Sequence, residues 1–342
     1  MPCRANQRSQ GTSLARNAGL SAAMLSFAPS EKRAIMSVRL APLAIAVALA
    51  ALVSGEALAQ MKSEKPALPD IQFAEIPSAS RANYQGDRFS YMEAGRPDAP
   101  VVLLLHGVGA NSMHWRYQLA GLSDRYRVIA WNAPGYMLTD GFVKDVAECK
   151  DFADAVADFL AALKLHKVNI VGNSFGSRVA QCFAIHYPQR VIKLAMTGTG
   201  VGPKDMPAEE KAKIIAIREG QVAKGIYGFG TRVAALLGPN PSPELVAEVQ
   251  RVLRATQPRG FMHGVKLGMV NGYSPEEVGA AVTMPVLLIQ GRHDKVNPGD
   301  KNAAVLIKFL KNGKLEWLEE YGHLPEVETP ETVNKMLRDF FG

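Results

Sequence analysis

The chain has 342 residues, 47% of them hydrophobic, which is enough to bury a full core in one large domain or two ordinary ones. Its formal net charge is +7, but the first 59 residues carry six basic and two acidic side chains, which leaves only +3 for the remainder. That remainder has no cluster of Lys and Arg and no interleaving of basic with aromatic residues, so a nucleic-acid partner is not expected.

The N-terminal segment has the three parts of a secretory signal peptide. A short basic lead at Met36–Arg39 precedes an apolar run of 14 residues at Leu40–Val53 and a small-x-small cleavage pattern at Ala57–Ala59. The run is too short for an ordinary membrane span, and Gln60 rather than cysteine follows the cut, so neither a stable membrane anchor nor a lipoprotein is expected. We therefore predict cleavage after Ala59 and a periplasmic or secreted mature chain.

The three cysteines are spread over the chain. Cys3 lies in the segment that would be removed, and the sequence leaves open whether translation starts at Met1 or at Met36. Cys149 and Cys182 remain in a compartment that permits disulfides, but two cysteines do not form a framework. Because Cys182 lies in an apolar helical stretch, a buried free thiol is the expected state, and the pairing of the two stays open.

From Ser78 onward, short apolar runs alternate with helical patterns. Runs that are apolar on both faces are typical of strands buried in a parallel sheet. Five of them predict strands, at Val101–Leu105, Tyr126–Ala130, Val168–Val171, Val191–Met196 and Val286–Ile289. Apolar residues at helical spacing predict the helices, most clearly at Phe152, Val156, Phe159, Leu160 and Leu163 and at Val333, Met336, Leu337, Phe340 and Phe341. The predicted fold class is α/β, a mostly parallel sheet with helices on both faces.

The alternation stops between about Gly202 and Thr283. This stretch carries helical patterns and turn signals but no convincing core strand, so it predicts an inserted helical cap. The predicted domains are a targeting segment at 1–59 with the signal peptide at 36–59, a core at 60–202 and 283–342, and the cap at 203–282.

The stretch "NIVGNSFGSRVA" (Asn169–Ala180) places a serine at a strand-to-helix corner. A serine hydroxyl is a poor nucleophile unless a base removes its proton and a sharp turn holds its oxygen clear of the protein surface. Gly172 and Gly176 flank Ser174 where strand and helix approach each other, so a side chain at either position would collide. The start of the following helix would also aim backbone N–H groups at an oxyanion near Ser174.

A nucleophilic serine needs a base and an orienting acid. Asp294 follows the last of the five predicted strands, and His323 follows the apolar run Leu315–Leu318. The order Ser174, Asp294, His323, each just after a strand, is the order that this architecture requires. Each residue alone has an ordinary structural interpretation, as a turn serine, a helix cap or a loop imidazole. Together they predict a catalytic triad.

With His106-Gly107 after the first of the five predicted strands, these features resemble the α/β-hydrolase fold family over essentially all of residues 80–342. The resemblance implies an oxyanion hole made by the backbone N–H groups of Val108 and Phe175. It also implies that His106 is structural rather than catalytic, and that the inserted helices cover the site as a cap.

Within this family, the sequence "GNSFG" looks most like the meta-cleavage-product hydrolases and the related enol-lactonases and esterases. Ser177 and Leu324 stand where the carbon-carbon hydrolases usually carry glycine and often tryptophan, and aspartate replaces Ser174 in dehalogenase-like and epoxide-hydrolase-like relatives. The resemblance therefore implies a serine hydrolase that cleaves a carboxylic ester or lactone through an acyl-enzyme on Ser174. Carbon-carbon bond hydrolysis is the alternative, and a non-catalytic ligand-binding protein on the same fold is a remote one.

A nucleotide-binding interpretation is weaker. Gly107-Val108-Gly109 follows a buried strand as the phosphate turn of a dinucleotide-binding unit would. Ser112 replaces the third small residue, however, and the next strand ends in Trp131-Asn132 rather than in a ribose-binding carboxylate. The seven histidines include no pair at helix-face ligand spacing, so no metal is expected, and acyl transfer by such a triad needs no cofactor.

The expected partner is a small-molecule substrate with an apolar part, and the chain is expected to be a monomer or a homodimer. Candidate pocket residues are Asn111, Trp131, Phe261, Met262 and Tyr273. Tyr227, Phe229 and Met269 add further apolar bulk to the predicted cap, where such residues line a pocket or pack among themselves.

Overall fold

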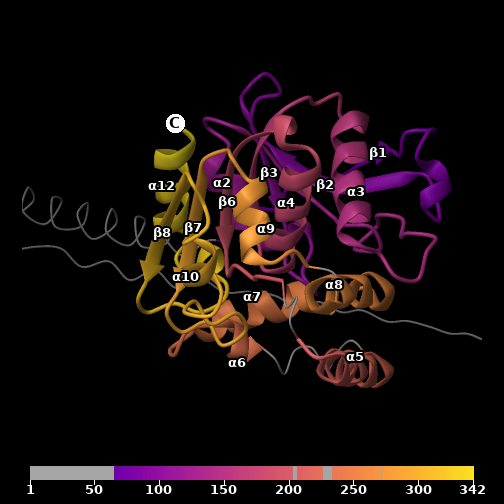
Figure 1. The fold of residues 1–342 in the computed structure, drawn as a ribbon. Helices are drawn as coiled ribbons and strands as arrows, with labels where there is room; N and C mark the ends of the chain where they lie inside the picture. The colour runs from indigo at the N-terminus through magenta and orange to yellow at the C-terminus, as the bar shows by residue number, and fades with distance from the viewer. Residues whose placement is uncertain (1–64, 203–205, 226–232, 271) are drawn as a thin grey trace, which may run out of the picture. The chain divides into compact units, whose positions relative to one another are not determined.

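The computed structural model describes residues 65–342 except 203–205, 226–232 and 271 (Figure 1). The predicted signal peptide and the two candidate start codons lie outside the described residues, as do Tyr227 and Phe229 and the side chain of Met269. Among the described residues, no helix combines the length and the apolar character that a membrane span would need.

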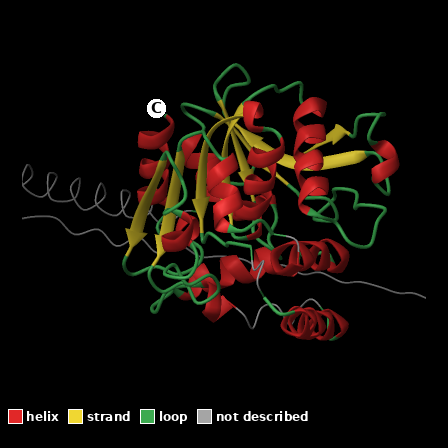
Figure 2. Cartoon of the chain, viewed as in Figure 1, coloured by secondary structure: helices red, strands yellow, loops and turns green. Residues whose placement is uncertain are grey.

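Eight strands form one sheet in the order β1-β2-β4-β3-β5-β6-β7-β8. Their bounds are β1 Ile71–Glu75, β2 Arg88–Ala94, β3 Val101–Leu105, β4 Arg127–Trp131, β5 Val168–Asn173, β6 Val191–Thr197, β7 Val286–Gly291 and β8 Gly313–Leu318. β2 pairs antiparallel with both β1 and β4, whereas all pairs from β4 to β8 are parallel. The prediction of a mostly parallel sheet is confirmed, and Figure 2 shows the helices around it.

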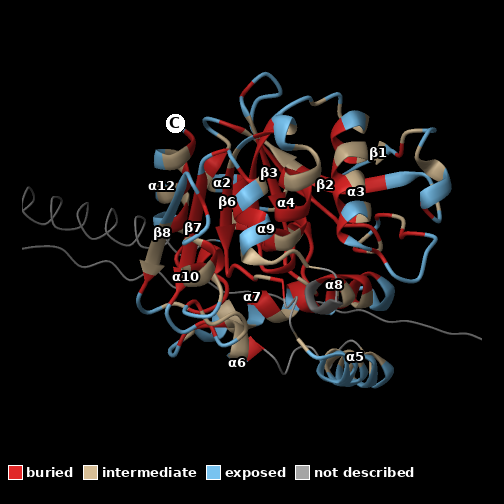
Figure 3. Ribbon diagram, viewed as in Figure 1, coloured by how far each residue is buried: buried red, intermediate tan, exposed pale blue. Residues whose placement is uncertain are grey.

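Described helices cover both faces of the sheet, as predicted. The α-helices of the described residues are α2 Arg116–Leu122, α3 Cys149–Ala162, α4 Phe175–His186, α5 Ala208–Ala223, α6 Val233–Leu236, α7 Pro243–Arg254, α8 Pro258–Val270, α9 Pro275–Ala281, α10 Ala303–Leu306, α11 Pro325–Glu328 and α12 Pro330–Phe341. Alternate residues of β3 point to opposite faces: Leu103 and Leu105 join a core cluster with α3, α4, α9 and α10, and Leu104 joins another with α2 and α12. Most residues of the strands β3 to β7 are consequently buried, on both sides of the sheet (Figure 3).

The segment between β6 and β7 is helical, as the sequence indicates. In Figure 1 the helices α5 to α8, named here the helical insertion, lie beyond the carboxyl ends of the strands. The segment's last helix, α9, differs from the others because Val278 packs in the core cluster that includes α4 and α10. That helix therefore belongs to the layer on the sheet rather than to the predicted cap.

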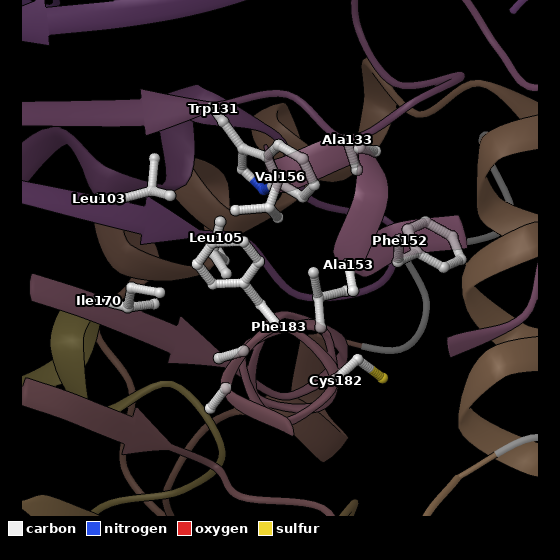
Figure 4. Close-up of a cluster of buried hydrophobic side chains, with 14 of the residues drawn as sticks. Leu103, Leu105, Trp131, Ala133, Phe152, Ala153, Val156, Ile170, Cys182 and Phe183 are labelled. Atoms are coloured by element: carbon white, nitrogen blue, oxygen red, sulfur yellow. The ribbon is translucent and has the colours of Figure 1, made fainter. Parts of the chain in front are cut away.

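Cys149 and Cys182 form a disulfide, so the expected buried free thiol is wrong. Cys149 opens α3 and Cys182 lies within α4, and the two helices pack side by side on one face of the sheet with the Cα atoms of the cysteines 5.4 Å apart. Figure 4 shows Cys182 near buried side chains of both helices. The pairing depends on how the two helices pack, and a separation of 33 residues in the sequence does not reveal it.

Candidate active site

Ser174 lies at the corner between β5 and α4 in a strained backbone conformation. Its φ is 53° and its ψ is −113°, a combination that residues with a side chain rarely adopt. The corner is fixed because the Ser174 N–H donates to the carbonyl oxygen of Thr197 at 3.0 Å. The serine is only 8% exposed, yet it borders a cavity at the carboxyl ends of the strands.

The two glycines of the corner leave no room for a side chain. A Cβ on Gly172 would collide with the carbonyl group of Gly176, and a Cβ on Gly176 would collide with the carbonyl oxygen of Leu105. Both obstacles are backbone atoms, which no side-chain rotation can move away. The sharp strand-to-helix turn under Ser174 therefore requires glycine at both positions.

Asp294 and His323 come together from the loops after β7 and β8. The His323 Nδ1–H donates to Asp294 Oδ2 at 2.9 Å, and both side chains are buried. The same carboxylate oxygen accepts from Gln290 Nε2 at 2.9 Å, while Oδ1 accepts from the backbone N–H groups of Val296 and Asn297, each at 2.8 Å. Four donors thus fix the Asp294 carboxylate, which in turn orients the imidazole.

The surroundings of Asp294 favour its ionised form. Burial alone would raise the pKa of this carboxyl group, but the His323 imidazole, its hydrogen bond and the donors from Asn297 and Gln290 outweigh burial. The pKa of Asp294 is therefore held below its usual range. A carboxylate that stays charged keeps the proton of His323 on Nδ1, which leaves Nε2 as the nitrogen able to accept one.

The loop after β3 lies against Ser174. A Cβ built on Gly107 would approach the Ser174 Cβ to 3.4 Å, and the next residue, Val108, borders the same cavity as the serine. Within the described part of the chain, the backbone N–H groups of Val108 and Phe175 donate to no protein acceptor. These two amides, expected as oxyanion donors, are therefore free to bind an oxygen atom near Ser174.

His106 lies inside the protein and does not border the cavity. Its Nδ1 contacts the carbonyl oxygen of Gly107 at 2.8 Å, and its Nε2 accepts from the backbone N–H of Ala133 at 3.2 Å. Burial lowers the pKa of His106 to about 3. The imidazole is thus a neutral link between the loops after β3 and β4, which fits the structural role that the family resemblance implies.

The cavity at Ser174 has about 770 Å³ of empty volume, part of it open to solvent, and a mostly apolar wall. It lies between the strand ends and the helical insertion. Its lining residues are Gly107, Val108, Gly109, Ala110, Met113, His114, Tyr117, Asn173, Ser174, Leu236, Glu248, Val249, Val252, Leu253, Phe261, Val296, His323, Leu324 and Val327. Such a shape and composition suit an organic molecule with an apolar part.

Of the candidate pocket residues, Phe261 alone lines this cavity. Trp131 ends β4 inside the core against Phe159, and Met262 packs against the apolar cluster of the helical insertion. The Tyr273 hydroxyl instead meets His186 Nε2 at 3.0 Å. These three placements differ from the expectation because side-chain direction depends on strand and helix packing, which residue type alone does not specify.

Asn111, the remaining candidate, has a different position. Its Nδ2 donates to the carbonyl oxygen of Val252 at 3.0 Å, and its Oδ1 accepts from the backbone N–H of Met113. The side chain therefore ties the loop after β3 to α7, one layer behind the cavity wall.

Sequence reasoning missed the acidic and basic side chains of the cavity wall. His114 Nε2 and Glu326 Oε1 are 2.6 Å apart and both residues are buried, although 212 positions separate them in the sequence. Glu248 of α7 also borders the cavity and binds Arg116 Nε at 3.0 Å and Lys65 Nζ at 3.3 Å. No local motif marks these pairs, since each joins distant elements. Among the described residues, no three His, Cys, Asp or Glu side chains gather as a metal site would require.

Comparisons with known proteins agree with this geometry. A 2-hydroxy-6-oxononadienedioate/2-hydroxy-6-oxononatrienedioate hydrolase of Dechloromonas aromatica is 27% identical over 252 residues, which cover 70% of this chain and 86% of that protein. An esterase of Thermogutta terrifontis has a similar fold, with a TM-score of 0.69 at 23% identity, over 79% of this chain and 98% of the esterase. The enol-lactonase of Burkholderia xenovorans gives a TM-score of 0.66 at 18% identity, over 75% of this chain and 98% of the lactonase. The alpha/beta hydrolase fold family matches residues 100–329, more than half of the sequence. This chain therefore belongs to the alpha/beta hydrolase fold family.

Proposed function

We propose that the protein is a serine hydrolase that cleaves a carboxylic ester or lactone through an acyl-enzyme on Ser174. The observation that carries this proposal is the buried Asp294–His323 pair, which borders the same cavity as a serine held on a strained corner. Nucleophile, base and orienting acid come from the ends of three different strands, β5, β8 and β7, in the arrangement that acyl transfer uses on several folds.

The proposed reaction has two halves. In the first, His323 Nε2 takes the Ser174 proton while the hydroxyl oxygen attacks the substrate carbonyl, and the protonated imidazole then gives this proton to the departing alkoxide. In the second, His323 takes a proton from water, which attacks the acyl-enzyme and releases the acid and free Ser174. Asp294 stabilises the imidazolium in each half and holds it in place.

The backbone amides of Val108 and Phe175 are the proposed oxyanion donors. Val108 lies in the loop directly after β3, and Phe175 begins α4. Donors fixed before the reaction need no rearrangement when negative charge develops on the carbonyl oxygen, which is why such sites lower the barrier.

The helical insertion is proposed to act as a cap that sets the substrate. Leu236, Val249 and Phe261 of α6, α7 and α8 line the cavity from this side. The expected substrate is a small molecule with an apolar part, and neither a metal ion nor an organic cofactor takes part in the proposed chemistry.

Export to the periplasm or beyond, with cleavage after Ala59, is also a proposal. The Cys149–Cys182 disulfide supports it, because such bonds persist in oxidising compartments and are rare in the cytosol of most organisms.

Hydrolysis of a carbon-carbon bond is the second candidate function. The name of the Dechloromonas relative favours it, since that name describes a dienedioate hydrolase. Ester hydrolysis is preferred because Ser177 and Leu324 differ from the usual residues of the carbon-carbon hydrolases beside the nucleophile and the base.

The proposed function is tested by active-site labelling and by a substrate panel. A fluorophosphonate should label the protein once, on the peptide that carries Ser174, and Ser174→Ala should lose the label and on the order of 10⁴-fold of kcat. Labelling at another residue would contradict the assignment.

In a panel of esters, lactones and ring-fission dienols, the best ester or lactone should have a kcat/KM at least about 100-fold above that of any dienol. A dienol that is turned over faster than all of them would place the second candidate first.

A further inference from the structure

A second cavity also borders Ser174. It has about 550 Å³ of empty volume, part of it open to solvent, and shares Val108, Ser174, Phe261 and Val296 with the first cavity. Its remaining wall differs in character, because it includes the side chains of Arg178, Arg218 and Asn297 beside Phe175, Gly264 and Val265. The nucleophile thus stands between an apolar cavity and one that carries two guanidinium groups.

Arg178 lies one helical turn after the nucleophile on α4. Its backbone N–H donates to the carbonyl oxygen of Ser174 at 3.3 Å, and its Nη2 donates to the carbonyl oxygen of Val201. A guanidinium has five N–H donors, so one carbonyl leaves most of them available. Burial lowers the pKa of Arg178 to about 10, which still keeps it charged at neutral pH. Among the described residues, no carboxylate forms an ion pair with it.

Arg218 reaches the same cavity from α5 in the helical insertion. Its Nη1 donates to the amide oxygen of Gln221 at 2.9 Å, and burial lowers its pKa as well. Within the described ranges it too lacks an acidic partner, and Asp294, which lies behind Asn297, already serves His323. Two like charges therefore line one partly dehydrated space, and no carboxylate among the described residues pairs with either of them, an arrangement that a bound anion would stabilise.

We propose that this second cavity binds an anionic group of the substrate, a carboxylate or a phosphate, between Arg178 and Arg218. Guanidinium groups present paired N–H donors that match the oxygen atoms of both kinds of group. The anion would hold the substrate at one side of Ser174 while its apolar part occupies the first cavity. The inference rests on the proposed function and narrows its substrate class to esters or lactones that carry a negative charge.

A purely structural role accounts for some of the contacts of the Arg178 side chain but not for the position of Arg218. The Arg178 bond to Val201 ties α4 to the chain that leaves β6, and a Cβ on the neighbouring Gly272 would lie only 2.8 Å from the guanidinium Nη1. Among the residues that the structure describes, Arg218 by contrast bonds only to Gln221 on its own helix, which has no buried residue. Variants of Arg218 are therefore the decisive ones, and those of Arg178 are secondary.

The test compares matched esters that differ in charge. On the leaving-group side, para-acetoxybenzoate and para-acetoxyphenyl phosphate are compared with neutral para-tolyl acetate, and on the acyl side monomethyl adipate is compared with methyl hexanoate. Wild type should prefer at least one anionic ester to its neutral counterpart. Arg218→Gln should lower that ratio of kcat/KM values about tenfold or more, and Arg218→Lys should restore part of it. The preferred ester shows whether the anion is a carboxylate or a phosphate and on which side it lies.

Arg254→Gln is the matched control, because Arg254 is an exposed arginine of the helical insertion that lines neither cavity. It should leave every ratio of kcat/KM between an anionic ester and its neutral counterpart within about twofold of wild type.

Arg178→Lys should lower this ratio, and Arg178→Met should lower it further. Circular dichroism checks that both variants fold. If they do not fold, the Arg218 variants decide alone. If Arg218→Gln leaves these ratios unchanged while ester cleavage still requires Ser174, this inference is wrong and the proposed function is unaffected. Ester cleavage that survives Ser174→Ala overturns the proposed function itself.

Discussion

His106 and His323 show how one residue type takes different roles from different surroundings. His323 borders the cavity with one nitrogen engaged by Asp294, so the other can exchange a proton with a substrate. His106 has both nitrogens occupied by backbone groups and is fully buried. Only the first can act as a base, and the second must stay neutral for the loops after β3 and β4 to keep their contact.

The pH dependence of the free energy of unfolding should show that the His106 imidazole stays neutral in the folded chain. The pKa of His106 is about 3 in the folded chain and close to the ordinary histidine value of about 6.5 when unfolded, so between these values the unfolded state binds more protons. His106 therefore stabilises the fold fully above pH 6.5 and loses about 1.4 kcal/mol for each pH unit below it. His106→Asn, which keeps a donor and an acceptor but does not titrate, should be less stable at pH 7, and its deficit should shrink towards pH 5. Urea unfolding across this range measures the difference, and parallel curves for the two proteins would contradict the assignment.

The helices α3 and α4 illustrate stabilisation at the scale of elements. Phe152 and Val156 of α3 pack in one apolar cluster with Val179 and Phe183 of α4, and the disulfide adds a covalent link between the same two helices. α4 begins at the nucleophile's corner, so whatever fixes α4 against the sheet also fixes the site.

The disulfide should contribute measurably to this pair of helices. The link closes a loop across a sequence separation of 33 residues, for which chain entropy gives about 3 to 4 kcal/mol. Replacing both cysteines by alanine should lower the free energy of unfolding by this amount, and a reductant should do the same to wild type. The double variant should not respond to reductant, which makes it the control. A wild type that unfolds equally with and without reductant would contradict the prediction.

At the scale of the whole molecule, the sequence predicted the centre of the sheet better than its edge. β3, β5 and β7 are buried on both faces and stand out in the sequence, whereas β1 and β2 went unpredicted because polar residues interrupt their apolar pattern. The proposed catalytic residues could be named from the sequence because each follows a strand within a short motif. The two arginines and His114 could not, since only the folded chain brings them to the cavities.

Export is the prediction that concerns the complete chain. Expressed from Met36 in a Gram-negative host, the protein should be recovered from the periplasm with Gln60 at its N-terminus and with no free thiol, because the removal of 36–59 accompanies transfer to an oxidising compartment. Intact mass and thiol titration measure both properties. A chain that begins at Gln60 behind a start methionine is the control and should stay in the cytoplasm. An unprocessed cytoplasmic product from the Met36 start would exclude the signal peptide.

Hydrogen bonds tie the loop after β3 to α7 and to the residue Thr256 behind it, so the position of the helical insertion affects the backbone amide of Val108 in that loop. Asn111 donates to the carbonyl oxygen of Val252, and the Thr256 hydroxyl donates to that of Gly109, so two residues that closely follow Val108 are attached to the insertion. An outward movement of α7 would therefore displace the Val108 amide and disrupt the proposed oxyanion site. α5 has no buried residue and can move without disturbing these bonds. A substrate that enters past α5 would therefore leave the contacts around Val108 in place, and only the part of the second cavity that Arg218 lines would depend on the position of α5.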